Sequence, residues 1–369
     1  MDTLKDKLSN LQKTAKERTV KTQNIEYDLE TLVKKIKKNI IKLDPEYQRN
    51  HRWNNDISSR LIESLILNIP IPTIYISQDV DVDLEIDEDE IARYSVIDGQ
   101  QRLTAINNYM TNSYPLSGLS VLDDLNGTFY KDLPTFLTRR LEERTVKCLR
   151  IDSTVDSQVK YDIFERLNTG AVKLEPQELR NAVCRGPFND LIKKLAKNND
   201  FRDLLQIDTK NPEENTKVKK MEDVELVLRF FALGNDNYLN YRKGFKQFLT
   251  DEMEKLNKED SNKLKDLEDV FIKTMSGIKE YFGNLAFAKY KKQSGVLKKV
   301  SNFNSAVYDA LAISFSSKVN LDNPSITAHT VEEYKELFKS TKFFDSVTGS
   351  VNDREKIIQR IGKVKEVFR

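Results

Sequence analysis

The sequence of 369 residues is poor in the side chains that build metal, redox or disulfide sites. It contains two cysteines, Cys148 and Cys184, and two histidines, His51 and His329. Two isolated cysteines exclude a disulfide framework, and so few cysteine and histidine side chains argue strongly against a zinc site. We therefore expect the protein to work in a reducing compartment and to be cytoplasmic.

Long apolar runs and an excess of one charge are also missing. No stretch approaches the roughly 20 apolar residues that a membrane span requires, and the first residues form a charged amphipathic pattern in place of a signal peptide. Sixty basic and 58 acidic residues leave a net charge of +2, which neither demands nor excludes a nucleic acid partner. We expect a globular protein that does not enter the membrane.

Hydrophobic periodicity divides the chain into a mixed part and a helical part. Short strand-like runs alternate with helices up to about residue 155, whereas helical spacing dominates after about residue 186. The pattern predicts an α+β protein with a helical arm (1–25), a small mixed α/β domain (26–155) and a larger all-α domain (156–369). The basic run 289–299 is either a solvated helical face or a surface for phosphates in which Tyr290 stacks on bases.

The stretch from Tyr94 to Ile106 stands out because a strand breaks at Asp98-Gly99 and restarts as an amphipathic helix. Gly99 lacks the Cβ that would keep a ligand off the backbone, the helix offers unpaired N–H groups, and Arg102 follows one turn later. This combination suits a phosphate at a solvent-facing loop. Asp98 either caps the helix, a purely structural role, or holds a magnesium ion and a water against the phosphate.

Three boxes that mix arginine, amides and turns follow one another in the sequence. They are Tyr47-Gln48-Arg49 with Trp53, Asp98-Gly99-Gln100-Gln101-Arg102, and Phe164-Glu165-Arg166-Leu167-Asn168-Thr169-Gly170 followed by Gln177-Glu178-Leu179-Arg180-Asn181-Ala182. With the later stretch Met221–Phe230, this succession closely resembles the GmrSD restriction-endonuclease N-terminal domain family over residues of about 26–310. That family has a fold related to the ParB/sulfiredoxin nucleotide-binding domain, and the Asp-Gly-Gln-Gln-Arg box is its hallmark.

The resemblance implies a protein that binds and hydrolyses a nucleoside triphosphate with Mg²⁺, in a DNA restriction or anti-phage defence system that acts on modified DNA. The catalytic residues would be Asp98, Gln100, Gln101 and Arg102, with Asp98 also holding the metal. Arg102 would clamp phosphate oxygens, and the two glutamines would position water or sugar. The implied nucleotide-binding residues are Gln48, Arg49, Gly99, Arg102, Arg166, Asn168, Glu178, Arg180 and Asn181.

Several of these roles have alternatives that the sequence leaves open. Arg49 is either a second cation for the phosphate or the partner of a structural salt bridge, and Trp53 fits a core plug better than a base-stacking ring. The polar patch Glu178, Arg180 and Asn181 either faces the ligand or locks the two domains together through an ion pair. The whole chain is either an enzyme or a non-catalytic module that binds nucleotide or DNA as a signal.

The sequence departs from many family members in its C-terminal part. Those members carry an HNH-type nuclease domain, whereas His329 has no further histidine near it with which to build such a metal site. We therefore expect no intrinsic HNH nuclease, and we expect DNA and a nuclease supplied by another chain as partners, beside the nucleotide. A homo-oligomer is compatible with the sequence.

Overall fold

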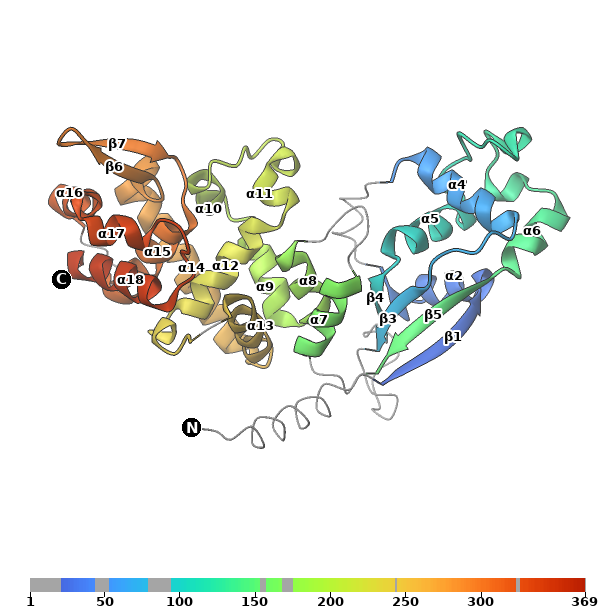
Figure 1. Cartoon of the computed structure of the whole chain (residues 1–369), viewed down its shortest axis with the longest axis horizontal. Helices are drawn as coiled ribbons and strands as arrows, with labels where there is room; N and C mark the ends of the chain where they lie inside the picture. Colours follow the sequence, from blue (N-terminus) through green and yellow to red (C-terminus); the bar gives the residue numbers. More distant parts are fainter. Residues whose placement is uncertain are drawn as a thin grey trace, which may run out of the picture. The chain divides into compact units, whose positions relative to one another are not determined.

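The computed structural model describes residues 21–43, 53–78, 94–152, 157–167, 175–242, 244–322 and 326–368. The chain divides into two compact units, Met1–Lys173 and Leu174–Arg369. The first unit contains a five-stranded sheet with helices, and the second is largely helical (Figure 1). The predicted α+β class, with a small mixed part followed by a larger helical part, is confirmed.

The sheet of the first unit is mixed in direction. Its strand order is β1-β5-β3-β4-β2, in which β1 and β5 are antiparallel, β5 and β3 parallel, β3 and β4 antiparallel, and β4 and β2 parallel. The strands are β1 (Thr22–Asp28), β2 (Ile41–Lys42), β3 (Ile74–Gln78), β4 (Tyr94–Asp98) and β5 (Thr145–Ile151). The strand β4 therefore has neighbours on both sides, which fixes the position where it ends at Asp98.

Five α-helices are described in the first unit, within the residue ranges given above. They are α2 (Leu29–Lys37), α4 (Asn55–Ile66), α5 (Gln100–Met110), α6 (Thr135–Glu142) and α7 (Ser157–Leu167). Side-chain caps start two of them, because Asp28 accepts a hydrogen bond from the Thr31 N–H (2.7 Å) and Asn54 accepts one from the Ile57 N–H (2.9 Å). Apolar residues of α2, α4, α5, β3 and β5 share one core, and Trp53 packs against it as the sequence predicts.

The second unit is built around the long helix α14 and the buried helix α15. Its helices are α8 (Pro176–Val183), α9 (Pro187–Leu195), α10 (Asn199–Leu204), α11 (Thr216–Lys219), α12 (Glu222–Leu233), α13 (Phe245–Leu256), α14 (Ser261–Phe282), α15 (Ser305–Lys318), α16 (Ala328–Glu336), α17 (Thr341–Ser346) and α18 (Arg354–Val367). One two-stranded hairpin, β6 (Lys289–Gln293) and β7 (Val296–Ser301), interrupts them. Helical spacing in the sequence predicts most of these helices but does not predict the hairpin.

A buried ionic cluster joins three helices of the second unit. Asp309 on α15 is fully buried and accepts hydrogen bonds from Arg229 on α12 (2.5 and 3.0 Å) and from Arg360 on α18 (2.6 Å). Burial alone would raise the pKa of Asp309, but the two arginine charges outweigh it and hold that pKa below its usual value. The arginine at 229, within the stretch that resembles the later family motif, thus has a structural partner.

Within the ranges described above, none of the helices combines the length and the apolar composition that a crossing of the membrane requires.

Candidate functional site

The Asp98–Arg102 box lies where the sheet strand β4 passes into helix α5. Asp98 is the last residue of β4 and pairs with Tyr75 of β3, Gly99 is the N-cap of α5, and Gln100 is its first residue. No side chain caps this helix, and its first turn contains no acidic residue. The first N–H groups of α5 are therefore free of a competing carboxylate, which is the arrangement that receives an anion.

Gly99 is required at this turn for two reasons. Its φ of 98° lies in the left-handed region, which L side chains rarely adopt. A Cβ at this position would also lie 3.0 Å from Ile74 Cγ1 and 3.2 Å from Arg102 Nη2. The glycine thus lets β3 and the arginine close in on the turn.

Arg102 is tied to the protein itself. Its Nη2 donates to Asp98 Oδ2 (2.7 Å), its Nη1 donates to the carbonyl oxygen of Pro72, and both nitrogens approach the Thr73 carbonyl at 3.4–3.5 Å. Residues 72 and 73 lead directly into β3. The guanidinium therefore connects the segment that enters β3 with the carboxylate at the end of β4.

The two charged residues of the box differ in exposure. The Arg102 side chain is 11% exposed, whereas the Asp98 side chain is 47% exposed. The prediction of a solvent-facing loop thus holds for Asp98 but not for Arg102, because the glycine turn lets the guanidinium lie against the segment that enters β3. Arg102 is placed to orient Asp98, and Asp98 is the group that reaches solvent.

The two glutamines of the box carry polar atoms without a partner. Gln100 is buried, and its Nε2 has no hydrogen-bond partner among the described residues; the Oε1 of the half-buried Gln101 is in the same position. A buried amide that lacks a partner costs free energy, and a ligand or water that reached it would recover that cost. Sequence reasoning selected both residues for the positioning of water or sugar, and that role stays a prediction.

The remaining predicted residues of the first unit lie partly outside the described ranges. Gln48, Arg49 and Asn168 belong to the undescribed residues. Arg166 lies near the C-terminal end of α7, a helix that contacts β4, and its side chain is exposed. An exposed arginine on a helix beside β4 is available to an anion.

The predicted patch on α8 is buried in the second unit. Arg180 is 1% exposed and donates to Glu225 Oε2 on α12 (2.9 Å) and to Gln177 Oε1 (2.6 Å). Asn181 accepts from Gln177 Nε2 (2.9 Å), and Glu178 accepts from the Glu175 N–H (2.7 Å) at the start of α8. These contacts anchor α8 to α12 and cap it, while a role of the three residues in nucleotide binding stays a prediction.

The comparisons with known proteins agree with the sequence boxes. Residues 29–184 match the family model described as the GmrSD restriction endonuclease, N-terminal domain. This match confirms the predicted family resemblance. It covers the strand, turn and helix of the Asp98–Arg102 box and relates the chain to restriction and defence proteins. No curated protein and no solved structure matches the chain.

The nucleotide with Mg²⁺ that the resemblance implies stays a prediction, and the residues of the box can be compared with what such a metal needs. No group of three or more His, Cys, Asp or Glu side chains suitable for a metal occurs within the described residues. Mg²⁺ often uses one or two carboxylates and takes its other ligands from phosphates and water. Asp98, half-exposed beside an uncapped helix N-terminus, suits a metal that arrives with its phosphates.

The nearest thiol to the box is not a reactive group. Cys148 on β5 is 1% exposed and pairs in register with Ile74 of β3. Burial raises the pKa of Cys148 to about 11, although the Arg102 charge opposes this shift. The thiol is protonated at neutral pH, and Cys148 therefore acts as a small buried apolar residue.

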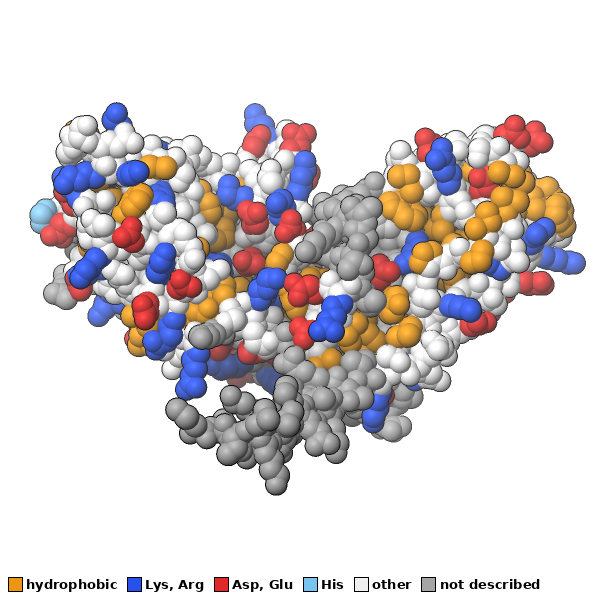
Figure 2. All heavy atoms as spheres, in the orientation of Figure 1, with side chains coloured by type: hydrophobic (Ala, Val, Ile, Leu, Met, Phe, Trp, Pro, Cys, Tyr) orange, Lys and Arg blue, Asp and Glu red, His pale blue; other side chains and the backbone are white. Residues whose placement is uncertain are grey.

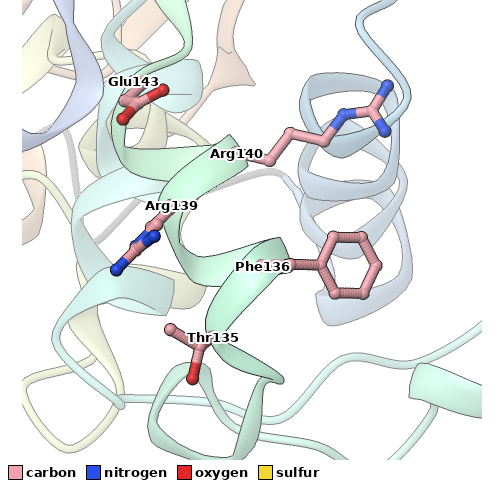
Figure 3. A pocket seen from close by; sticks show the side chains of 5 residues that line it. All are labelled: Thr135, Phe136, Arg139, Arg140 and Glu143. Carbon is pink, nitrogen blue, oxygen red and sulfur yellow. The ribbon is translucent and has the colours of Figure 1, made fainter.

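A shallow depression on α6 lies apart from the predicted residues. Thr135, Phe136, Arg139, Arg140 and Glu143 line it, and all belong to this one helix or follow it directly. Figure 3 shows these side chains fanning out from the helix, with Phe136 and Arg140 on one side and Arg139 on another. Because the side chains do not converge on a common point, the depression provides no enclosed binding site.

Sequence reasoning did not identify the acceptors that hold Arg102. These are main-chain carbonyls of Pro72 and Thr73, and a main-chain acceptor cannot be recognised from the type of side chain in the sequence. The available signal was the Pro70-Ile71-Pro72 segment, because proline prevents regular strand pairing and leaves carbonyls free at the entrance to β3.

Proposed function

We propose that this chain is the nucleoside-triphosphate-binding and hydrolysing component of a DNA restriction or anti-phage defence system. The observation that carries the proposal is the turn at Asp98-Gly99, where an uncapped helix N-terminus meets a half-exposed carboxylate within a region that matches the GmrSD N-terminal domain. A phosphate at the N-terminus of α5 would lie next to Asp98 and to the unpaired amide of Gln100.

In this proposal each residue of the box has a distinct task. The N–H groups of the first turn of α5 bind phosphate oxygens, and the exposed carboxylate of Asp98 holds a magnesium ion or orients a water. Mg²⁺, when bound, neutralises charge on the phosphates. Arg102 positions Asp98 through its 2.7 Å ion pair and is a positioning residue, since its other donors are taken up by backbone carbonyls.

Release of inorganic phosphate from ATP, GTP, CTP and UTP, with and without duplex DNA, tests the proposal. The variants are Asp98→Asn and the control Asp124→Asn, which changes an exposed aspartate of the same unit. We expect Asp98→Asn to abolish phosphate release and the control to retain it. Equal turnover by wild type and Asp98→Asn would remove Asp98 from the mechanism.

A second candidate function is a non-catalytic module that binds the nucleotide as a signal. It is favoured by the engagement of Arg102 with the protein's own carbonyls and by the lone carboxylate of the box. Equilibrium dialysis with the same four nucleotides separates the two functions. Binding without phosphate release supports the module, and the failure of all four nucleotides to bind refutes both.

We further propose that DNA cleavage is supplied by a partner chain. The purified protein should then leave plasmid DNA intact with Mg²⁺ or Mn²⁺ and any of the four nucleotides, because no HNH-type histidine site can be assembled from its sequence. Nicking that survives further purification and disappears in a carboxylate variant of this chain would show that the chain cleaves DNA itself.

A further inference from the structure

The β6–β7 hairpin of the second unit has an unusual charge. Residues 289–301 contain five lysines and no acidic residue, although the chain as a whole has a net charge of only +2. One of the five, Lys289, is engaged within the fold, because its ammonium lies 4.7 Å from the centre of the Phe344 ring and donates to Thr348 Oγ1 (2.6 Å). The other four lysines are exposed.

The two faces of the hairpin differ in their environment. On the inner face, Tyr290 is 6% exposed and its ring packs 5.5 Å from that of Phe338. On the outer face, alternation along β7 places Val296, Lys298 and Val300 together, and the two valines are 63% and 55% exposed. The alternative in which Tyr290 stacks on bases is not supported, because this ring belongs to the core, and the alternative of a solvated helical face is wrong, because these residues form a hairpin.

The outer face places like charges opposite each other. Lys291 of β6 is the direct cross-strand partner of Lys298 of β7. Like charges in such a pair destabilise a sheet, and no ion pair joins Lys291, Lys292, Lys298 or Lys299 to any residue within the described ranges. In Figure 2 the surface where Figure 1 draws the hairpin carries lysine or arginine and hydrophobic side chains. A polyanion would relieve this repulsion.

We propose that the β6–β7 hairpin binds double-stranded DNA, with its lysines on the phosphates and its outer face in the major groove. The major groove admits a two-stranded β-ribbon, and exposed valines can contact thymine methyl groups there. A single strand is the poorer fit, because single-strand sites use exposed aromatic rings and the one aromatic residue of this hairpin is buried. The proposal concerns the second unit and does not depend on nucleotide hydrolysis.

Fluorescence anisotropy of a labelled duplex of about 20 base pairs, with the full chain and no nucleotide, tests this surface. The test variant is Lys291→Gln with Lys298→Gln, and the matched control is Lys263→Gln with Lys265→Gln, two exposed lysines of α14 in the same unit. Each lost phosphate contact lowers the slope of log K against log salt by about 0.9, so we expect the test variant to bind about 10- to 60-fold more weakly at 0.1 M salt.

The outcomes separate the proposal from its alternatives. Loss of duplex binding in the test variant, with binding retained in the control and in Lys291→Arg with Lys298→Arg, supports the hairpin as the DNA surface. Unchanged binding by the test variant overturns it, as does the absence of wild-type binding at 50 mM salt. Stronger binding to a single strand or to vesicles of phosphatidylserine than to the duplex also overturns it. Phosphate release stays a separate measurement, so failure here does not affect the nucleotide proposal.

Discussion

Replacement of Arg102 should affect stability and activity together, whereas replacement of Asp98 should affect activity alone. Arg102→Ala leaves the carbonyls of Pro72 and Thr73 without their donor and breaks the contact to Asp98. Hydrogen bonds from a charged donor contribute about 1.5–3 kcal/mol, and the lower part of this range applies because Pro72 is exposed and Thr73 half-buried. The ion pair adds at most about 1 kcal/mol, because Asp98 is 47% exposed and solvent screens it. We expect a loss of about 2–4 kcal/mol in the free energy of unfolding of the first unit.

Lysine at position 102 should restore little of this loss. Arg102→Lys keeps the positive charge but replaces a planar fork with one ammonium, which cannot reach the backbone carbonyls and Asp98 together. We expect a cost of about 1–2 kcal/mol and strongly reduced phosphate release. Asp98→Asn keeps an acceptor oxygen near Arg102, so its stability should change by less than about 1 kcal/mol while phosphate release is lost.

The single tryptophan of the chain makes this measurement specific to the first unit. Trp53 packs against the core of that unit, so its fluorescence during urea unfolding reports on that unit alone. The Arg102→Ala transition should move by about 1–2 M urea to lower concentration. If Arg102→Lys unfolds at the wild-type midpoint and releases phosphate at the wild-type rate, the positioning role of Arg102 is refuted.

Three further predictions concern other positions. Gly99→Ala should lower the tryptophan unfolding midpoint and abolish nucleotide binding, because alanine at a φ of 98° is strained and its Cβ crowds Ile74; a wild-type midpoint would contradict the turn. Asp309→Asn should cost about 3–5 kcal/mol, measured by circular dichroism, because the buried Arg360 loses its carboxylate partner and Arg229 is left with that of Glu225, at 4.0 Å. Since the folded pKa of Asp309 lies below the unfolded value, its contribution is present above about pH 4 and is lost on further acidification, and the variant should lack that component. Cys148, with a pKa raised to about 11, should react with Ellman's reagent at pH 8 only after urea unfolding, and rapid labelling of the folded protein would refute its burial.

Much of the fold follows from local sequence signals. In the sequence, Asn54 predicts an N-cap, Pro176 predicts a helix start, and 3.6-residue apolar spacing predicts a helix over Phe245–Leu256. The structure has α4, α8 and α13 at these places, because caps, proline and helical spacing act locally. The strand-to-helix turn at Asp98-Gly99 was predictable for the same reason. A glycine between a strand pattern and a helix pattern indicates a turn at that residue.

Two elements of the fold, β1 and the β6–β7 hairpin, are not predicted by the local hydrophobic pattern. Residues 22–28 form β1 where the sequence suggests only a polar break before the helix that starts at Asp28, because β1 is stabilised by its antiparallel pairing with the distant β5. The β6–β7 hairpin lies in a region where the sequence pattern predicts helices. Ser294 and Gly295, both at positive φ, form its two-residue turn, and this Ser-Gly pair is the sequence signal for the hairpin.

The sequence predicts where the candidate site lies, but it does not predict that the Arg102 side chain is buried. The structure has the predicted strand, glycine turn and helix at the box. The burial of Arg102, by contrast, depends on the close approach of the segment that enters β3. Such a contact between distant segments leaves no periodic pattern in the sequence from which it could be predicted. In the function we propose, this contact makes Arg102 a support for Asp98, while the predicted role as a phosphate clamp stays a prediction.

The acceptors of Arg102 have a consequence for genetic experiments on this protein. Because Pro72 and Thr73 offer main-chain oxygens, every amino acid at these positions presents the same acceptor. A suppressor screen that starts from Arg102→Ala should therefore recover no compensating side-chain change at position 72 or 73. Revertants should instead restore arginine itself or raise the stability of the first unit elsewhere, so Asp98 is the one side chain among the described residues that pairs with Arg102 and at which a compensating change could act.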